Sequence, residues 1–209
     1  MAEYEYHIFL SHRRSNPDVL RWTRDCFLRP LRAQLGPAIP GLRIFFDEQQ
    51  IDQGASWPDA LAAAHARSRI LVPILSPDYF FSDWCLLELA LMYERERLLG
   101  FRTPGNPRSL IFPVIINDGD SFPADIKAIQ SHDLKAHANF DIQIGSVEQT
   151  ALTRSIKEWS ESLVSALENL PPCDDGWSAI AHDRFRDTFR ILAGQVTTVP
   201  ALTTIILPS

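Results

Sequence analysis

The chain has 209 residues, of which 45% are hydrophobic and 22% are charged. These fractions match ordinary globular domains and exclude a disordered or coiled-coil protein. The net charge of -6, without any run of Lys or Arg, argues against a nucleic-acid backbone or an anionic membrane as the main partner. The length suits one domain of roughly 150 residues with an extension, or one large domain.

Cysteine content and the first residues bear on the compartment. Cys26, Cys85 and Cys173 are an odd number, lie far apart and lack CxxC spacing, so reduced thiols are expected in place of a disulfide framework or a zinc site. The opening MAEYEY lacks the basic and apolar segments of a signal peptide, and no apolar run reaches the ~18 to 20 residues that cross a bilayer. We therefore expect a cytoplasmic protein.

Short, mostly continuous apolar runs are typical of buried parallel strands. They are YHIFLS (6–11), LRIFF (42–46), RILVPILS (69–76) and SLIFPVII (109–116), and the polar HDLKAH (132–137) is a candidate fifth strand at an edge. Segments with helical spacing alternate with them, marked by Leu20, Phe27, Leu31 and Leu35; Leu61 and Ala64; Leu87 through Leu98; and Leu152, Ile156, Trp159, Leu163 and Leu167. The alternation predicts an α/β fold with helices on both faces of a parallel sheet and functional residues at the carboxyl ends of the strands.

The segment PPCDDG after Leu170 breaks this pattern. We expect residues 171–209 to form a C-terminal extension with a short helix at 183–192. Its last residues, VTTVPALTTIILP, are β-branched and weakly charged, so they are expected to pack on the domain or on a partner.

Two loops at the predicted carboxyl edge carry polar residues. The first strand ends in SHRR, where Arg13 and Arg14 suit a carboxylate or a phosphate because a guanidinium donates two parallel hydrogen bonds; a solvated loop is the equally weighted alternative. The second strand is followed by DEQQIDQGASWPDAL, in which Gly54 suits a positive φ and Ser56 can cap the next helix. Trp57 either covers the core, which we favour, or stacks on a ring.

The third strand leads into SDWCLLELALM (82–92), an almost wholly apolar run that holds one carboxylate, Glu88. Ser82 can cap a helix that begins near Asp83, which places Glu88 in the second turn, four residues after Trp84. An unpaired buried charge costs several kcal/mol, so Glu88 is expected either to have a structural partner or to face a cavity. Its place at the mouth of a parallel sheet favours the cavity.

Several common site motifs are absent from the sequence. No GxGxxG or GxxxxGK[ST] follows a strand, and GxSxG does not occur. The first strand does not end in the acidic residues of a phosphoacceptor receiver. The six His residues are scattered, so we predict no metal site.

Three blocks, in order, resemble a Toll/interleukin-1 receptor (TIR) domain. They are YHIFLSHRR, RIFFDEQQIDQGASWPDALAAAHARSR and ILVPILSPDYFFSDWCLLEL, of which the third is the specific one because it follows the family pattern LSxxYxxSxWCxxEL. The resemblance covers residues 4–170 and implies a TIR domain at 1–170 with a flavodoxin-like five-stranded parallel sheet, leaving 171–209 outside. His7 and His12 depart from the family pattern, which usually has an acidic and an aromatic residue there.

The resemblance also implies a function. Many family members hydrolyse or cyclise NAD+ and release nicotinamide, whereas others are adaptors that only assemble. The catalytic glutamate of the enzymes lies at the WCxxE position, which is Glu88 here, and its presence favours an enzyme resembling the stand-alone bacterial TIR NADases of antiphage defence. NAD+ would be the substrate, without a further cofactor, and its expected contacts are Ser11, Arg13, Arg14, Trp57 and Trp84.

Partners follow from the same resemblance. The BB loop, with Asp52, Gly54 and Ser56, is expected to meet a neighbouring subunit, so activity would depend on self-association or on a separate sensor, and an ADP-ribose product would act on a separate effector. Two rivals remain open. One is a non-catalytic adaptor that assembles through the same loop, and the other is a nucleoside deoxyribosyltransferase-like enzyme, which shares the parallel sheet and a lone glutamate.

Overall fold

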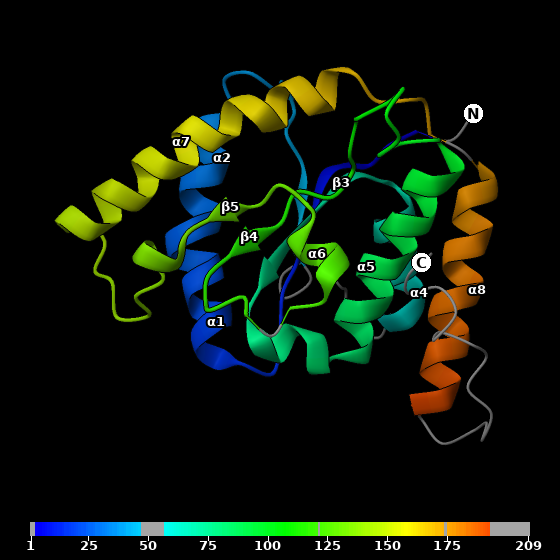
Figure 1. The fold of residues 1–209 in the computed structure, drawn as a ribbon, viewed down its shortest axis with the longest axis horizontal. Helices are drawn as coiled ribbons and strands as arrows, with labels where there is room; N and C mark the ends of the chain where they lie inside the picture. Colours follow the sequence, from blue (N-terminus) through cyan, green and yellow to red (C-terminus); the bar gives the residue numbers. More distant parts are fainter. Residues whose placement is uncertain (1–2, 47–56, 121, 174, 193–209) are drawn as a thin grey trace.

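The computed structural model describes residues 3–46, 57–120, 122–173 and 175–192. Within these ranges five parallel strands form one sheet in the order β2-β1-β3-β4-β5, and Figure 1 labels β3, β4 and β5 of this sheet. The strands are β1 (Tyr6–Ser11), β2 (Ile44–Phe45), β3 (Ser68–Leu75), β4 (Val114–Ile115) and β5 (His132–Asp133). This order is the flavodoxin-like one, so the predicted α/β class and the fifth strand are confirmed.

Three of the strands are shorter than predicted, and the segment 132–137 contributes only His132–Asp133 to β5. The runs at 42–46 and 109–116 contribute only two paired residues each to β2 and β4, with one further isolated bridge between Leu71 and Ile111. A continuous apolar run reports burial, and buried residues such as Phe46, Leu110 and Ile116 flank the two paired residues of each strand without being part of it.

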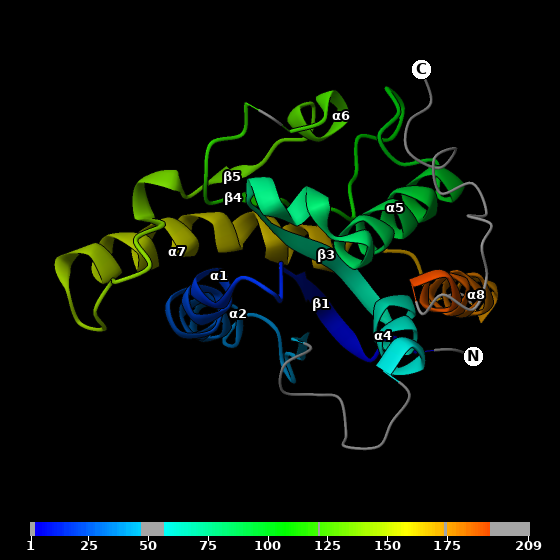
Figure 2. The same ribbon diagram turned by 90° about the horizontal axis from the view of Figure 1, so that it is seen from below.

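Helices cover both faces of the sheet, as Figure 2 shows. One face carries α1 (Pro17–Trp22), α2 (Arg29–Leu35) and α7 (Val147–Glu168), and the other carries α4 (Trp57–Ala66), α5 (Asp83–Leu98) and α8 (Asp175–Leu192). Side chains of β1 alternate between the two cores: Ile8 and Leu10 pack with α1, α2 and α7, whereas Phe9 packs with α4 and α5. The short elements η2 (Pro77–Phe81), α6 (Ala124–Lys127) and η3 (Lys135–His137) lie in the connections.

A π-helical segment, η1 (Thr23–Leu28), joins α1 to α2. Pro30 follows it and has no N–H, so the carbonyl of Cys26 cannot receive the usual helical bond from that position. The side-chain amide of Gln149 on α7 donates to this carbonyl at 3.3 Å. The irregular turn is thereby satisfied, and it fixes α7 against the first helices.

The helix α8 begins at Asp175, eight residues before the predicted start at 183. Trp177, Ala181 and Phe185 recur at intervals of four, are buried, and pack against α4 and α5 in one core. The predicted start was wrong because the helix begins within PPCDDG itself. The apolar stripe that packs on the domain begins at Trp177, directly after this segment. Residues 193–209 of the predicted extension lie outside the described residues.

None of the helices in the described ranges combines the length and the apolar character needed to cross a membrane.

Candidate active site

A cavity of about 500 Å³ opens at the carboxyl ends of β1 and β3. The chain leaves β1 toward α1 on one face and leaves β3 toward α5 on the other, so the two loops diverge and leave a crevice between them. Its volume is within the usual ~300 to 1,000 Å³ of small-molecule sites. The lining residues are Phe9, Leu10, Ser11, His12, Arg13, Arg14, Ser15, Ser82, Trp84, Cys85 and Glu88.

The two loops that border the cavity are tied to each other. Asn16 caps α1 by accepting a hydrogen bond from the Val19 amide at 3.2 Å, and its side-chain nitrogen donates to Asp78 at 2.8 Å. The hydroxyl of Ser76 donates to the other oxygen of Asp78. The polar residues after β1 and β3 therefore hold the two strand ends in one arrangement.

The helix α5 begins at Asp83 with Ser82 as its N-cap, as predicted, and the Ser82 hydroxyl accepts from the Cys85 amide at 3.4 Å. Spacing of three and four residues puts Trp84, Cys85 and Glu88 on one side of the helix, and all three line the cavity. The Cys85 thiol donates to the main-chain carbonyl of His12 at 3.4 Å, which joins α5 to the loop after β1.

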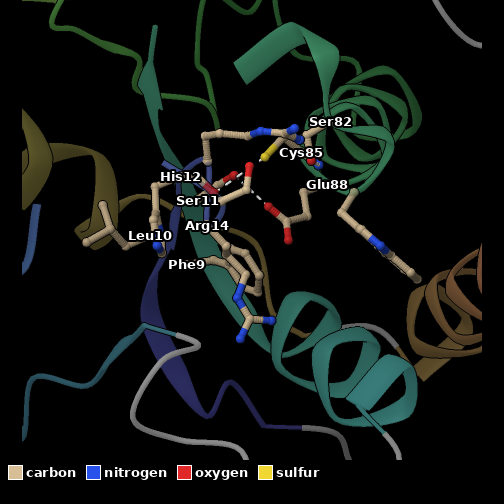
Figure 3. A pocket seen from close by; sticks show the side chains of 11 residues that line it. Phe9, Leu10, Ser11, His12, Arg14, Ser82, Cys85 and Glu88 are labelled. Atoms are coloured by element: carbon tan, nitrogen blue, oxygen red, sulfur yellow. Dashed lines mark hydrogen bonds between the residues drawn. The ribbon is translucent and has the colours of Figure 1, made fainter. Parts of the chain in front are cut away.

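Glu88 lies at the cavity wall with 6% of its surface exposed. Figure 3 shows its side chain pointing from α5 toward Ser11, whose hydroxyl donates to Glu88 Oε2 at 2.5 Å. The Tyr79 hydroxyl lies 2.8 Å from Ser11 Oγ and donates to the Cys85 carbonyl at 3.2 Å. Burial raises the pKa of Tyr79 well above its ordinary value, so the phenol keeps its proton.

Two buried histidines lie beside the site. His12 stacks on Phe46 with ring centroids 4.8 Å apart, and burial, together with the charge of Arg14, lowers its pKa to about 4. His65 on α4 lies with Nε2 2.9 Å from the main-chain carbonyl of Glu88, and burial lowers its pKa to about 3. Both rings are therefore neutral at pH 7. Because a carbonyl only accepts, the His65 proton is on Nε2.

Five of the six predicted substrate contacts and catalytic residues meet at this cavity: Ser11, Arg13, Arg14, Trp84 and Glu88. Arg13 is half-buried and approaches the Phe81 carbonyl at 3.5 Å, whereas Arg14 is exposed. The sixth, Trp57, starts α4, but its side chain lies outside the described part of the chain.

The predicted BB-loop residues Asp52, Gly54 and Ser56 also lie outside the described residues. Within the described ranges no cluster of His, Cys, Asp and Glu suits a metal ion.

The sequence analysis did not select Tyr79, His12 or His65. Tyr79 is the Tyr of the LSxxYxxSxWCxxEL pattern, so the motif contained a signal for it. His65 stands in the Ala-rich LAAAHARS, and nothing in that segment indicates a contact with a residue 23 positions further along.

A buried carboxylate at a cavity wall is suited to stabilise positive charge that develops on a bound molecule, because burial limits the screening of its field. The class of protein is thus an α/β protein with a flavodoxin-like sheet and a carboxylate-lined cavity at the carboxyl ends of its strands. The family model for the TIR domain matches residues 8–146, well over half of the chain, and the chain belongs to the TIR domain family.

Individual relatives come from plants and from an animal. The chain is 28% identical over 128 residues to a probable 2' cyclic ADP-D-ribose synthase, BdTIR, of Brachypodium distachyon, covering 60% of this chain and 54% of that protein. It is 34% identical over 97 residues to disease resistance protein RML1B of Arabidopsis thaliana, covering 46% of this chain and 9% of that protein. The chain thus spans about half the length of the first relative and a small part of the second.

One solved structure that is similar to this chain is the TIR domain of the Toll-related receptor TRR-2 from Hydra magnipapillata. It is 16% identical, covers 73% of this chain and 98% of its own, and has a TM-score of 0.45.

Proposed function

We propose that this protein is an NAD+ nucleosidase that releases nicotinamide and forms ADP-ribose or a cyclic ADP-ribose. The observation that carries the proposal is Glu88, a buried carboxylate at the wall of a cavity at the sheet's carboxyl edge. It occupies the WCxxE position that the family resemblance assigns to the catalytic glutamate. The name of the Brachypodium relative, a cyclic ADP-ribose synthase, supports the same reaction.

The reaction needs one well-placed anion. The bond between ribose C1′ and the nicotinamide nitrogen breaks, and its electron pair neutralises the cationic ring, so the leaving group needs no acid. Positive charge develops on the ribose, as in other glycosidic cleavages, and the Glu88 carboxylate either stabilises this charge or attacks C1′ directly. Water, or a hydroxyl of the ADP-ribose itself, then bonds to C1′ and gives up a proton, which yields the linear or the cyclic product.

Other residues of the cavity suit the rest of the dinucleotide. Trp84 offers a ring on which a cationic nicotinamide gains about 0.5 to 2 kcal/mol. Arg13 and Arg14 lie on the loop after β1 and are suited to the pyrophosphate, because guanidinium groups donate paired hydrogen bonds to phosphate oxygens. Trp57 is proposed as a second ring contact. NAD+ is the substrate, and no separate cofactor is needed.

The proposed setting is cytoplasmic antiphage defence in a bacterium, as for the bacterial enzymes that the sequence resembles. The name of the Arabidopsis resistance protein supports a role in defence. We propose that the loop with Asp52, Gly54 and Ser56 contacts a neighbouring subunit and that this self-association, or a sensor protein, switches the enzyme on. The ADP-ribose product then acts on a separate effector, or NAD+ depletion is itself the response.

The test is liquid chromatography of NAD+ incubated with the wild type and with Glu88→Gln, under conditions that promote oligomers. We expect nicotinamide release by the wild type and its loss in the variant. Glu161→Gln, which changes an exposed carboxylate on α7, is the matched control and should behave like the wild type. Parallel incubation with deoxynucleosides tests the deoxyribosyltransferase alternative.

Absence of nicotinamide release from an oligomeric wild-type sample would overturn the enzymatic proposal and favour the adaptor.

A further inference from the structure

We propose that the helix α8 holds the active site in its working geometry, with Phe185 and His65 as positioning residues for Trp84 and Glu88. The helix spans Asp175–Leu192 and so lies wholly beyond the residues 8–146 that match the TIR family model. The inference rests on the proposed function, because it assigns these residues to the same site.

The first contact runs from α8 to Trp84. The rings of Phe185 and Trp84 are stacked, with centroids 6.1 Å apart and planes 16° from parallel. Phe185 is fully buried, whereas Trp84 is half-buried and also lines the cavity. The indole is therefore bordered by the cavity and by a fixed ring of α8. A stacked aromatic neighbour restricts the orientation of the indole and so the plane on which a substrate ring can lie.

The second contact reaches Glu88 through His65. On one side, the ring of His65 packs against Trp177 and Phe185 of α8, with centroids 6.5 and 5.8 Å away. On the other, its Nε2 donates to the Glu88 carbonyl at 2.9 Å, and its ring meets Phe9, a cavity residue, at 5.2 Å. The imidazole thus lies between α8 and the site.

This hydrogen bond is suited to positioning. A carbonyl oxygen within a helix already accepts a hydrogen bond from the amide four residues further on. The His65 N–H therefore bonds to the second lone pair of the Glu88 carbonyl oxygen, and this bond ties α4 to α5 at the residue that carries the carboxylate. His65 is fully buried and its Nδ1 has no partner within the described residues, so the surroundings hold the ring by packing and by this single bond. Burial is the main cause that lowers the pKa of His65; the hydrogen bond to the Glu88 carbonyl raises it, and the charge of Arg95 lowers it further.

The helix α8 is itself anchored to the domain. The guanidinium of Arg95 lies over the Trp177 ring at 5.8 Å and donates to the Ser68 carbonyl of β3 at 2.8 Å. The Tyr4 hydroxyl donates to the Pro171 carbonyl at 3.0 Å, just before α8. A displacement of α8 would therefore act on both site residues together, and the contacts with Arg95 of α5 and with Tyr4 oppose such a displacement.

The first experiment uses Phe185→Leu, which keeps an apolar group in the core but removes the ring. We expect KM for NAD+ to rise about three- to tenfold, the size of a lost ring contact. The matched control is Phe27→Leu, an equally buried ring in the opposite core that stacks on Trp22. It should lower stability comparably and leave KM within about twofold of the wild type.

A second readout does not depend on activity. In protein labelled with 5-fluorotryptophan, the ¹⁹F resonance of Trp84, assigned with Trp84→Phe, should shift in Phe185→Leu and stay in place in Phe27→Leu, which should move Trp22 instead. An unmoved Trp84 resonance would overturn the α8 contact. A wild type that never releases nicotinamide would sink the proposed function, yet this resonance would still report on the contact.

The third measurement concerns His65. His65→Leu removes the donor, and we expect kcat to fall about tenfold with KM nearly unchanged, because the carboxylate is displaced more than the substrate contacts. His65→Gln places a side-chain N–H at a similar reach and should restore kcat to within about twofold of the wild type. If both variants lose kcat equally, His65 contributes packing alone, and the positioning role is overturned.

Discussion

The helix α5 carries two buried carboxylates eight residues apart, and they differ in what surrounds their oxygens. Glu96, 1% exposed, accepts from the Arg102 guanidinium, from Ser109 Oγ at 2.8 Å and from the amides of Leu110 and Ile111 at 2.5 and 3.1 Å. Glu88, 6% exposed, accepts from the hydroxyl of Ser11 and borders the cavity. Burial is nearly the same, but the neighbours are not.

The comparison separates a structural carboxylate from one suited to chemistry. The donors around Glu96 come from the segment that follows α5, where Gly100 and Arg102 have positive φ angles of 64° and 56° and turn the chain toward β4. Its acceptor capacity is used to fix this turn. Glu88 instead shares its wall with a space that a small molecule can enter. A buried charge alone therefore does not mark a site, whereas a buried charge at a cavity does.

The largest expected effect is on the structural side. Glu96→Ala removes the acceptor of the half-buried Arg102 guanidinium and of two amides, and we expect the free energy of unfolding to fall by about 3 kcal/mol. Urea denaturation followed by circular dichroism measures this. A midpoint within error of the wild type would contradict the structural role assigned to Glu96.

The reverse pattern is expected at the other carboxylate. Glu88→Gln should lower nicotinamide release about 10²- to 10³-fold, the effect of losing one group that stabilises transition-state charge. Gln can still accept from Ser11, so the free energy of unfolding should change by less than about 1 kcal/mol. A variant that unfolds as readily as Glu96→Ala would remove the distinction between the two ends of α5.

Stability should also fall in mild acid. His12 and His65 have pKa values of about 4 and about 3 in the folded protein, below their ordinary 6.5, because burial disfavours their charged forms. The unfolded chain binds protons below pH 6.5 that the folded protein does not, so stability is present above that pH and is lost as the pH falls toward 4. Between pH 7.5 and 5.5 the two rings together account for a loss of about 3 kcal/mol.

Urea midpoints across this range measure the slope, and His65→Gln should reduce the loss between pH 7.5 and 5.5 by about 1.4 kcal/mol, the share of one of the two rings. An unchanged slope in that variant would show that His65 is not neutral in the folded protein.

The smallest expected effect concerns the Tyr79 hydroxyl, which lies beside Ser11 near Glu88. Tyr79→Phe removes the hydroxyl that lies beside Ser11 and donates to the Cys85 carbonyl, and the free energy of unfolding should fall by about 1 kcal/mol. The measurement is again urea denaturation. A loss as large as that of Glu96→Ala would mean that the Tyr79 hydroxyl contributes as much to the free energy of unfolding as the ion pair of Glu96 does.

Much of the fold followed from the sequence, because local patterns report burial and helix capping. Apolar runs located the strands, and Ser82 before an apolar stretch located the start of α5. The same signals failed where pairing or packing decides the outcome: β2 and β4 are shorter than their runs, and α8 begins at Asp175 because its aromatic stripe packs on α4.

The sequence by itself determined that Glu88 is a carboxylate in an apolar helix near the carboxyl edge of a parallel sheet. Only the tertiary structure decided what this carboxylate meets. Ser11 lies 77 residues earlier in the chain, and His65 lies on another helix, so no local pattern joins them to it. Contacts between residues distant in sequence depend on how the layers pack, which is why only the fold shows that Glu96 is enclosed by donors and that Glu88 borders a cavity.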